Sequence, residues 1–568
     1  MRTTVLRRLG GLAGVGLLGI FLYAGLTSLS AQTEPAAALT GQVRSQEEGP
    51  MEGVLVSAKR EGSTITVSVV SDAQGRYRFP RAKLEPGKYA LSVRAVGYDL
   101  EGSRSVDIVA SQAATADMQL RKTEDLASQL SNAEWMMSMP GTDQQKLALI
   151  SCTGCHTLER IVKSRHDTAG FMQVMARMAS YAPGSSPRFP QKRIAERDGA
   201  VNPERFRRQA EWLSTINLSA VSKWEYPLQT MPRPKGRATR VVITEYDLPR
   251  PLTQPHDVIL DPDGIAWYSD FGQQYLGRLD PKTGAVKEYQ VPLLKQGFPL
   301  GGLDIELDRE GNLWYGLMLQ GGIAKFDRKA EKFQLFPLPS DINNDVAQQA
   351  MVMPVRLHVD GKVWMNNVGR RGIHRMDLAT GKFETFEPYK DLLPAGAGGG
   401  GMEGGGHSVY GIAADSKNNL FFMDFGSENI GRADAKTGKL QLFPTPTRDS
   451  APRRGRIDSQ DRLWFAEYRG NKVALFDTKT EKFQEWAMPT QYTHPYDVMV
   501  DKNGEVWTGG MTTDRIVRLD TKTGQTTEYL LPHETNLRRA HVDNRTTPVT
   551  FWVGNNHFPS VVKVEPLD

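Results

Sequence analysis

The chain has 568 residues and a mass of 63.1 kDa, and at roughly 150 residues per domain this length predicts three or four domains with buried cores. Hydrophobic residues make up 39% and charged residues 24%, which excludes both a disordered chain and a protein with many membrane spans. The formal net charge is +5, but without Arg2, Arg7 and Arg8 it falls to near +2, so a nucleic-acid partner is not expected.

Residues 1–31 have the pattern of a secretory signal peptide. Arg2, Arg7 and Arg8 precede an apolar run at about 9–26, and small residues lead to Ala31, where cleavage is expected. An uncleaved membrane anchor is the alternative, because an apolar run of about 18 residues can just span a bilayer. The residues that flank the paired arginines match the twin-arginine motif poorly, which favours a Sec-type signal. We therefore expect the remaining chain in the periplasm.

Short strands separated by glycine and proline turns are predicted at residues 38–122. Their alternating pattern is typical of a small antiparallel β-sandwich. The sequence at 71–79, with Pro86-Gly87 and Gly97-Tyr98, resembles the carboxypeptidase regulatory-like domain, whose carbohydrate-binding-like fold is shared with glycan-binding modules. The resemblance implies a structural or interaction module without catalytic residues. Sugar binding is the alternative, with Tyr98 as an exposed aromatic side chain.

The chain has two cysteines, three positions apart, and Cys152, Cys155 and His156 form a C-x-x-C-H sequence. This is the attachment motif of c-type haem, in which the thiols bond to the two vinyl groups and the adjacent histidine ligates the iron. A thioredoxin-type pair would need a preceding strand, and a zinc site would need a second pair of ligands; the sequence predicts neither. We therefore predict one covalent haem c in an all-α cytochrome c-like domain at residues 135–220.

The sixth ligand of the haem iron is expected on a helix after the motif. The sequence at 152–162 is similar to the short cytochromes attached to periplasmic dehydrogenases, in which a methionine on that helix ligates the iron, and Met178 matches its place. Met172 and Met175 share a helical stripe with Met178, so Met175 is an alternative, as is His166. An iron with His and Met ligands has no open position and suits one-electron transfer. The resemblance implies a periplasmic cytochrome or dehydrogenase as the redox partner.

After a linker predicted at 221–239, the sequence at 240–568 becomes periodic. Aromatic anchors recur at intervals of 43 to 57 residues, which is typical of a β-propeller with one four-stranded blade per repeat. The last repeat stops at its third strand, 561–565, and residues 240–249 copy the fourth strand of a blade. This strand is expected to complete the last blade and leave no open sheet edge. The seven anchors are Trp267, Trp314, Trp364, Phe421, Trp464, Trp507 and Trp552.

The repeats, for example 255–270 and 463–473, resemble the streptogramin (virginiamycin B) lyase family over residues 240–568. In that family, two histidines and an acidic residue of adjacent repeats act with a divalent cation in an elimination that opens a cyclic depsipeptide. His256 is the one histidine at a repeat start, so the two-histidine arrangement is not preserved here. The catalytic candidates that the resemblance suggests are His256, Asp270, Glu467, His407 and His494.

Polar residues at the starts and ends of the repeats are expected to line a funnel at one end of the propeller. The first strand of a repeat runs away from the funnel and the second runs back to it, so His256 should lie beside Asp270, 14 residues later. Mixed arginines and carboxylates suggest a small polar or anionic ligand, and ordinary hydrogen bonding between blade loops is the alternative. The glycine-rich segment 396–406 is expected to form a mobile loop over this funnel. The further funnel residues are Tyr410, Asp424, Arg453, Tyr496, Arg538 and Arg539.

The expected fold is mainly β: an N-terminal β-sandwich, a small all-α haem domain and a seven-bladed β-propeller. One hypothesis is a periplasmic electron-transfer protein whose propeller binds a substrate or a partner. A second is a lyase or hydrolase that acts on a cyclic ester or lactone, with a divalent cation in the funnel. Because elimination moves no net electrons, that hypothesis leaves the haem unexplained. A third is a non-catalytic binding scaffold, and fold alone does not separate the three.

Overall fold

A computed structural model of the protein describes residues 36–102, 104–194, 203–218, 224–391 and 406–568. The fold is mainly β, as expected. The predicted signal peptide and nearly all of the glycine-rich segment lie outside the described residues. Among the residues that the structure describes, none of the helices is long and apolar enough to cross a membrane.

The segment 37–122 forms a β-sandwich around one apolar core. In β6, Tyr89 and Leu91 alternate with exposed residues and reach this core, as the period of a half-buried strand requires. Tyr98 is buried, and its hydroxyl donates to Glu48 Oε1 at 2.7 Å, so the exposed aromatic side chain on which the sugar-binding alternative depended is not found at this position. The strands are β1 (Ala37–Ser45), β2 (Gly49–Pro50), β3 (Leu55–Arg60), β4 (Ile65–Val70), β5 (Arg76–Pro80), β6 (Gly87–Arg94), β7 (Tyr98–Leu100), β8 (Arg104–Ile108), β9 (Ala114–Thr115) and β10 (Met118–Lys122).

Short helices follow the sandwich, and local capping explains where they begin. Ser131 and Glu134 form a capping box at the first helix, and Thr142 and Gln145 form another at the second. The Asp167 side chain caps the fourth by accepting from Gly170 N. The helices are α1 (Asn132–Ser138), α2 (Asp143–Leu147), α3 (Glu159–Val162), α4 (Thr168–Ala179) and α5 (Pro203–Ile216), with the 3-10 turns η2 (Leu126–Gln129) and η3 (Cys152–Gly154).

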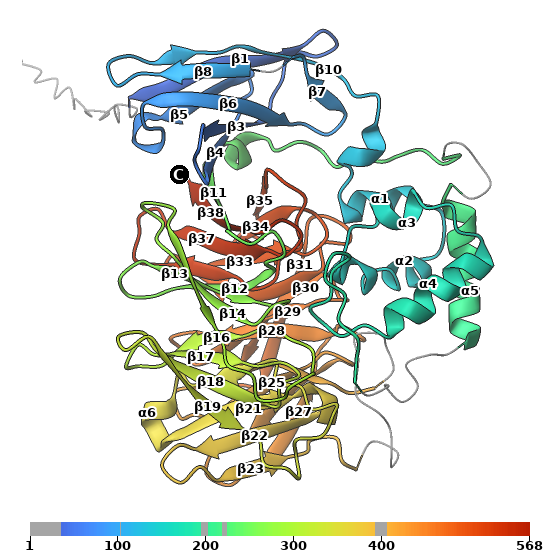
Figure 1. The fold of residues 1–568 in the computed structure, drawn as a ribbon, viewed down its shortest axis with the longest axis vertical. Coiled ribbons are helices and arrows are strands. Elements are labelled where there is room, and N and C mark those ends of the chain that lie inside the picture. The colour runs from blue at the N-terminus through green and yellow to red at the C-terminus, as the bar shows by residue number, and fades with distance from the viewer. Residues whose placement is uncertain (1–35, 103, 195–202, 219–223, 392–405) are drawn as a thin grey trace, which may run out of the picture. The chain divides into compact units, whose positions relative to one another are not determined.

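The C-terminal region forms seven blades within the part of the chain that the structure describes. Six of them are four-stranded antiparallel sheets whose strands follow in sequence order (Figure 1). These are β12 (Pro255–Leu260), β13 (Ala266–Asp270), β14 (Tyr275–Leu279), β15 (Val286–Gln290); β16 (Ile305–Leu307), β17 (Leu313–Gly316), β18 (Gly322–Asp327), β19 (Lys332–Pro337); β20 (Val352–Met353), β21 (Lys362–Asn367), β22 (Gly372–Asp377), β23 (Phe383–Phe386); β24 (Val409–Ala414), β25 (Leu420–Asp424), β26 (Asn429–Ala433), β27 (Leu440–Pro444); β28 (Pro452–Ile457), β29 (Arg462–Glu467), β30 (Lys472–Asp477), β31 (Lys482–Ala487); and β32 (Pro495–Val500), β33 (Glu505–Gly510), β34 (Arg515–Asp520), β35 (Thr526–Leu530).

A recurring hydrogen bond explains four of the aromatic anchors, Trp267, Trp314, Trp464 and Trp507. An aspartate opens the turn before the second strand of a blade, and the indole nitrogen six residues later donates to its carboxylate. The bond measures 2.8 Å from Trp267 to Asp261 and 3.0 Å from Trp507 to Asp501. Because the carboxylate also accepts backbone amides of the turn, as Asp261 does from Asp263 and Ile265, one residue fixes both turn and anchor.

The seventh blade is completed by β11 (Val241–Asp247), which pairs antiparallel with β38 (Ser560–Pro566), as the sequence predicted. The order of its strands is β36 (His541–Asp543), β37 (Thr550–Asn555), β38 and β11. The other edge of β11 pairs with β4 of the sandwich, which the sequence did not predict. Blade seven and the sandwich strands β4, β3, β6 and β8 therefore form one continuous eight-stranded sheet.

The predicted linker packs against both neighbouring regions where the structure describes it. Arg233 Nε donates to the Glu52 carbonyl at 2.9 Å, and the Arg233 guanidinium lies over the ring of Tyr98. Met231 N donates to Glu134 Oε1 of α1 at 2.7 Å. These contacts tie the segment that precedes β11 to the sandwich and to the helices.

Candidate functional site

The helical segment covers one end of the propeller. Ala133 N of α1 donates to the Thr512 carbonyl at 2.9 Å, and the Tyr492 hydroxyl donates to Asp143 Oδ1 at 2.8 Å. On the side of blade one, Gln254 Nε2 donates to the Gly184 carbonyl at 2.9 Å. Figure 1 shows the helices α1–α5 gathered together beside the blades. This end carries the loops that lead into the first strand of each blade.

The C-x-x-C-H sequence forms the turn η3 and the residues that follow it. The two cysteines are not joined in a disulfide, and burial raises the pKa of Cys155. His156 Nδ1 lies 2.8 Å from the Thr157 carbonyl oxygen, and burial lowers the pKa of the imidazole. Nδ1 then donates to that carbonyl, which directs Nε2 as the coordinating nitrogen of a neutral ring, the form that binds iron. Two thiols and an imidazole fixed in this way fit covalent haem.

Loops of blade seven hold this motif. Asn536 Nδ2 and His557 Nε2 each lie 2.9 Å from the carbonyl oxygen of Thr153. Arg538 Nη2 lies 3.5 Å from the Gly154 carbonyl oxygen. Asn536 and His557 belong to this site, although sequence reasoning did not identify them. No spacing pattern links them to the motif, which lies more than 380 residues earlier in the chain.

The structure places the candidate sixth ligands on or near α4. Met178 is 39% exposed, whereas Met172 and Met175 are partly buried against the apolar cluster that also receives Cys152. The His166 ring meets Phe171 edge-on, with ring centroids 5.5 Å apart. The assignment of Met178 as the ligand stays a prediction.

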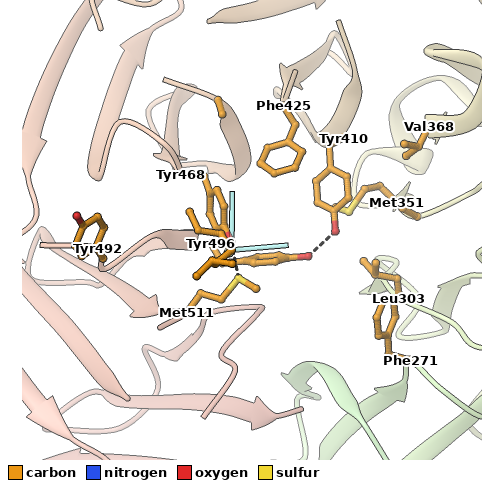
Figure 2. Packing of buried hydrophobic residues seen from close by; sticks show 14 of the residues in the cluster. Phe271, Leu303, Met351, Val368, Tyr410, Phe425, Tyr468, Tyr492, Tyr496 and Met511 are labelled. Atoms are coloured by element: carbon orange, nitrogen blue, oxygen red, sulfur yellow. Dashed lines mark hydrogen bonds between the residues drawn. The ribbon is translucent and has the colours of Figure 1, made fainter. Parts of the chain in front are cut away.

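A buried network is linked to the C-x-x-C-H turn through Arg538, which contacts both Gly154 and Tyr496. His256 Nδ1 is 2.7 Å from Asp257 Oδ1, and His256 Nε2 is 3.1 Å from the Tyr496 hydroxyl. The Tyr496 and Tyr410 hydroxyls are hydrogen-bonded to each other (Figure 2). Burial lowers the pKa of His256 to about 3, so its ring is neutral at physiological pH.

Arg453 occupies a box of aromatic rings in this network. Its guanidinium carbon lies 3.8 Å from the ring centroid of Tyr496 and 4.4 Å from those of Phe425 and Tyr468. These rings are shown in Figure 2. Burial opposes ionisation of Tyr496, but the positive charges of Arg453 and Arg538 outweigh it and lower the pKa of that phenol. Arg538 also lies over the Tyr496 ring, at 5.2 Å, and so connects this network to the haem motif.

Arginines and carboxylates form a second buried layer. Arg454 contacts both Asp257 oxygens, at 2.8 and 2.9 Å, and reaches Asp304 at 2.6 Å. Arg539 bridges the same two carboxylates and adds Glu306 at 2.9 Å. Such paired charges are stable without solvent only because each has several partners.

The residues expected to line an open funnel are buried, because the helical segment covers them. Asp270 does not bind His256; its carboxylate binds the Arg250 guanidinium at 2.6 Å. His407 pairs with Asp424 at 2.6 Å, and His494 Nδ1 contacts the Tyr468 carbonyl at 2.9 Å. Four of the five catalytic candidates thus have protein partners of their own: His256, Asp270, His407 and His494. The buried residues are His256, Asp270, Tyr410, Asp424, Arg453, Glu467, His494, Tyr496, Arg538 and Arg539.

Glu467 and a divalent cation were also expected in the funnel. Burial and the nearby Glu485 raise the pKa of Glu467 to about 8. Its carboxyl oxygens have no hydrogen-bond partner within the described residues. Nor do those residues contain three His, Cys, Asp or Glu side chains grouped so as to bind a metal ion.

Two family descriptions match parts of this chain. Residues 38–121 match the carboxypeptidase regulatory-like domain, and residues 401–565 match the virginiamycin B lyase family. No curated protein matches the chain.

Solved structures resemble the propeller at low sequence identity. A streptogramin B lyase is 22% identical and has a TM-score of 0.47; the match covers 58% of this chain and all of that one. Virginiamycin B lyase from Staphylococcus aureus is 20% identical, with 57% and 98% of the two chains covered and a TM-score of 0.47. YCF48 bound to D1 peptide is 11% identical, with 56% and 94% covered and a TM-score of 0.42. The chain thus joins a region similar to the carboxypeptidase regulatory-like domain to a propeller similar to that of the virginiamycin B lyase family.

Proposed function

We propose that the protein is an exported c-type haem protein in which one-electron transfer is linked to the propeller. The observation that carries this proposal is the position of the C-x-x-C-H turn, whose Thr153 carbonyl accepts hydrogen bonds from two propeller side chains. A haem domain that was an unrelated passenger would not need buried polar contacts of this kind. The haem motif and the propeller therefore act as one unit.

Cys152 and Cys155 would hold the haem covalently, and His156 would be the proximal ligand, with Met178 as the expected sixth ligand. When bound, haem with these ligands supplies one-electron transfer and offers no open position to a substrate. Arg538 places a positive charge beside the motif, which stabilises the reduced iron relative to the oxidised iron. The chain around the motif therefore favours a haem of high potential.

The lyase hypothesis is less favoured. All of its candidate residues except His407 are buried and all except Glu467 have hydrogen-bond partners, whereas a cyclic depsipeptide would need access to them. The helical segment lies over the end of the propeller where that access would be required. The scaffold hypothesis leaves the oriented His156 without a role.

The pattern of the first 31 residues and the haem motif together favour the periplasm, with a cytochrome or dehydrogenase as the redox partner. The sandwich would serve as an interaction module, because its sheet continues into the propeller. A divalent cation is not part of this proposal.

The test is expression with export in a bacterium that attaches haem to secreted proteins. We expect haem staining that survives denaturing electrophoresis, and an α-band on reduction with dithionite. Cys152→Ser with Cys155→Ser should abolish the covalent stain, whereas Thr153→Ser, inside the same motif, should retain it. A folded protein without covalent haem would refute the proposal. So would a bound haem that no electron donor or acceptor can titrate reversibly.

A further inference from the structure

Polar side chains from the first strands of the blades meet at the centre of the propeller. Arg454 of blade five contacts Asp257 of blade one at 2.8 and 2.9 Å, although these two blades are not neighbours in the ring. Asp304, directly before the first strand of blade two, accepts from the same guanidinium at 2.6 Å. We call the charged and hydrogen-bonding side chains that meet in this way the axial column.

The axial column reaches the C-x-x-C-H turn at one end. Asp257 lies 2.7 Å from His256 Nδ1, and His256 Nε2 lies 3.1 Å from the Tyr496 hydroxyl. Arg538 lies over the Tyr496 ring and also contacts the turn itself. A continuous series of contacts therefore leads from Asp304 to the haem motif.

The other end of the column is less deeply buried. Glu306 lies two residues after Asp304, which is about 7 Å along a strand that runs away from the covered end. Arg456 follows Arg454 in the same way; its side chain is 15% exposed, and its Nη2 lies 3.8 Å from Glu306 Oε1. Arg539 joins the two levels, because it contacts Asp304 at 3.1 Å and Glu306 at 2.9 Å. Solvent thus approaches the column beside Glu306, one guanidinium away from Asp304.

The charges around Asp304 favour a proton there. Burial raises the pKa of Asp304; neighbouring carboxylates add to the rise, and neighbouring arginines oppose it. His256 and His541 are neutral, because burial lowers the pKa of each to about 3. Blade three adds an uncharged group, the Val352 amide, which donates to Asp304 at 3.0 Å. Among the described residues of this part of the column, the carboxylates Asp257, Asp304, Glu306 and Asp497 outnumber the guanidinium groups of Arg454, Arg456 and Arg539.

From this geometry we infer that the axial column binds one proton when the haem is reduced, with Asp304 as the site. Asp304 takes one proton from solvent as one electron arrives from the redox partner, and it returns the proton when the electron leaves. The added electron makes the haem end of the column more negative, which increases the proton affinity of a nearby acid. The inference rests on the proposed function, because it needs a haem that cycles between two redox states.

The test is to measure the reduction potential of the purified haem-loaded protein from pH 6 to pH 10. The potential should fall as the pH rises, by at most about 59 mV for each tenfold decrease in proton concentration. Asp304→Asn removes the titrating group at nearly constant volume and should flatten this dependence. Glu467→Gln is the matched control and should keep the wild-type dependence. Glu467 is equally buried and also has a raised pKa, but none of the contacts described above links it to the column.

A second measurement keeps the inference testable if Asp304→Asn does not fold. Infrared difference spectra of the wild-type protein, reduced minus oxidised, should show the band of a protonated carboxyl group that appears on reduction and shifts in heavy water. Absence of this band would contradict the inference without any variant.

A wild-type potential that does not change with pH would overturn the inference and leave the proposed function intact. An Asp304→Asn protein that keeps the wild-type dependence would also overturn it, since the proton would then bind elsewhere, for example at the haem propionates. Equal flattening by Asp304→Asn and Glu467→Gln would have the same result, because it would indicate a general effect of charge. A protein whose haem cannot be reduced and reoxidised would reject the proposed function, and this inference with it.

Discussion

The two donors to the Thr153 carbonyl should act cooperatively in holding the haem motif on the propeller. Asn536→Ala removes one donor and leaves the other, so the loss should be close to the net value of one hydrogen bond, about 1 kcal/mol. His557→Phe should cost a similar amount while keeping the ring volume. The double variant removes both donors from a buried residue. An unsatisfied buried carbonyl costs about 1–3 kcal/mol, so the double loss should exceed the sum by about 1 kcal/mol.

Hydrogen exchange at residues 152–158 is the suitable assay, because a chain with several domains need not unfold in one step. A loss of about 1 kcal/mol should speed local exchange roughly fivefold, and a loss of about 3 kcal/mol should speed it more than 100-fold. Asn544→Ala, an exposed asparagine of the same blade, is the control and should leave this peptide unchanged. Strictly additive effects, or equal acceleration across the whole chain, would contradict the shared-acceptor argument.

Three further predictions concern the haem ligand and the buried charges. Met178→Ala should shift the haem spectrum and lower the reduction potential of the haem, whereas Met175→Ala should change neither. Spectroelectrochemistry of the two variants tests this, and the reverse result would assign Met175 as the sixth iron ligand. Because the pKa of Glu467 is raised from 4.5 to about 8, the folded state holds its proton more tightly, and stability should fall as pH rises through that window. Glu467→Gln should flatten this fall in stability, measured by thermal melts at pH 5–9. If the dependence of stability on pH is unchanged in the variant, the titrating group is not Glu467. Arg454→Met leaves Asp257 short of a partner and should cost about 3–5 kcal/mol in urea unfolding, while a neutral effect would contradict the pairing.

The propeller was predictable because its information is local and repeated. In four blades an aspartate precedes the anchor tryptophan by six residues, so the pattern seen at Asp261 and Trp267 recurs along the sequence. The closing strand was predictable for the same reason, since β11 copies a motif seen in other blades. The helices were marked by caps such as Thr142 and Asp167.

The cover over the propeller end was not predictable, because its contacts join distant segments that share no pattern. Asn536 meets Thr153 across 383 positions of chain, and Tyr492 meets Asp143 across 349. Sequence reasoning therefore placed polar residues such as Arg453 in an open funnel, whereas burial made them part of the core. The pairing of β4 with β11 was not predicted for a related reason. The pattern of a strand shows that it has an edge, but it does not show which other strand pairs with that edge.

The position of β11 between β4 and β38 has a consequence for synthesis on the ribosome. The strand β4 leaves the ribosomal exit tunnel before β11, and β38 follows only after the six blades that lie between them in the chain. Throughout the synthesis of six blades, β11 would otherwise wait with two bare edges, a state prone to wrong pairing. Pairing with β4 can cover one edge of β11 as soon as both strands have emerged, so that a single edge stays open until β38 pairs with it. The N-terminal sandwich thereby becomes a built-in template for closing the ring.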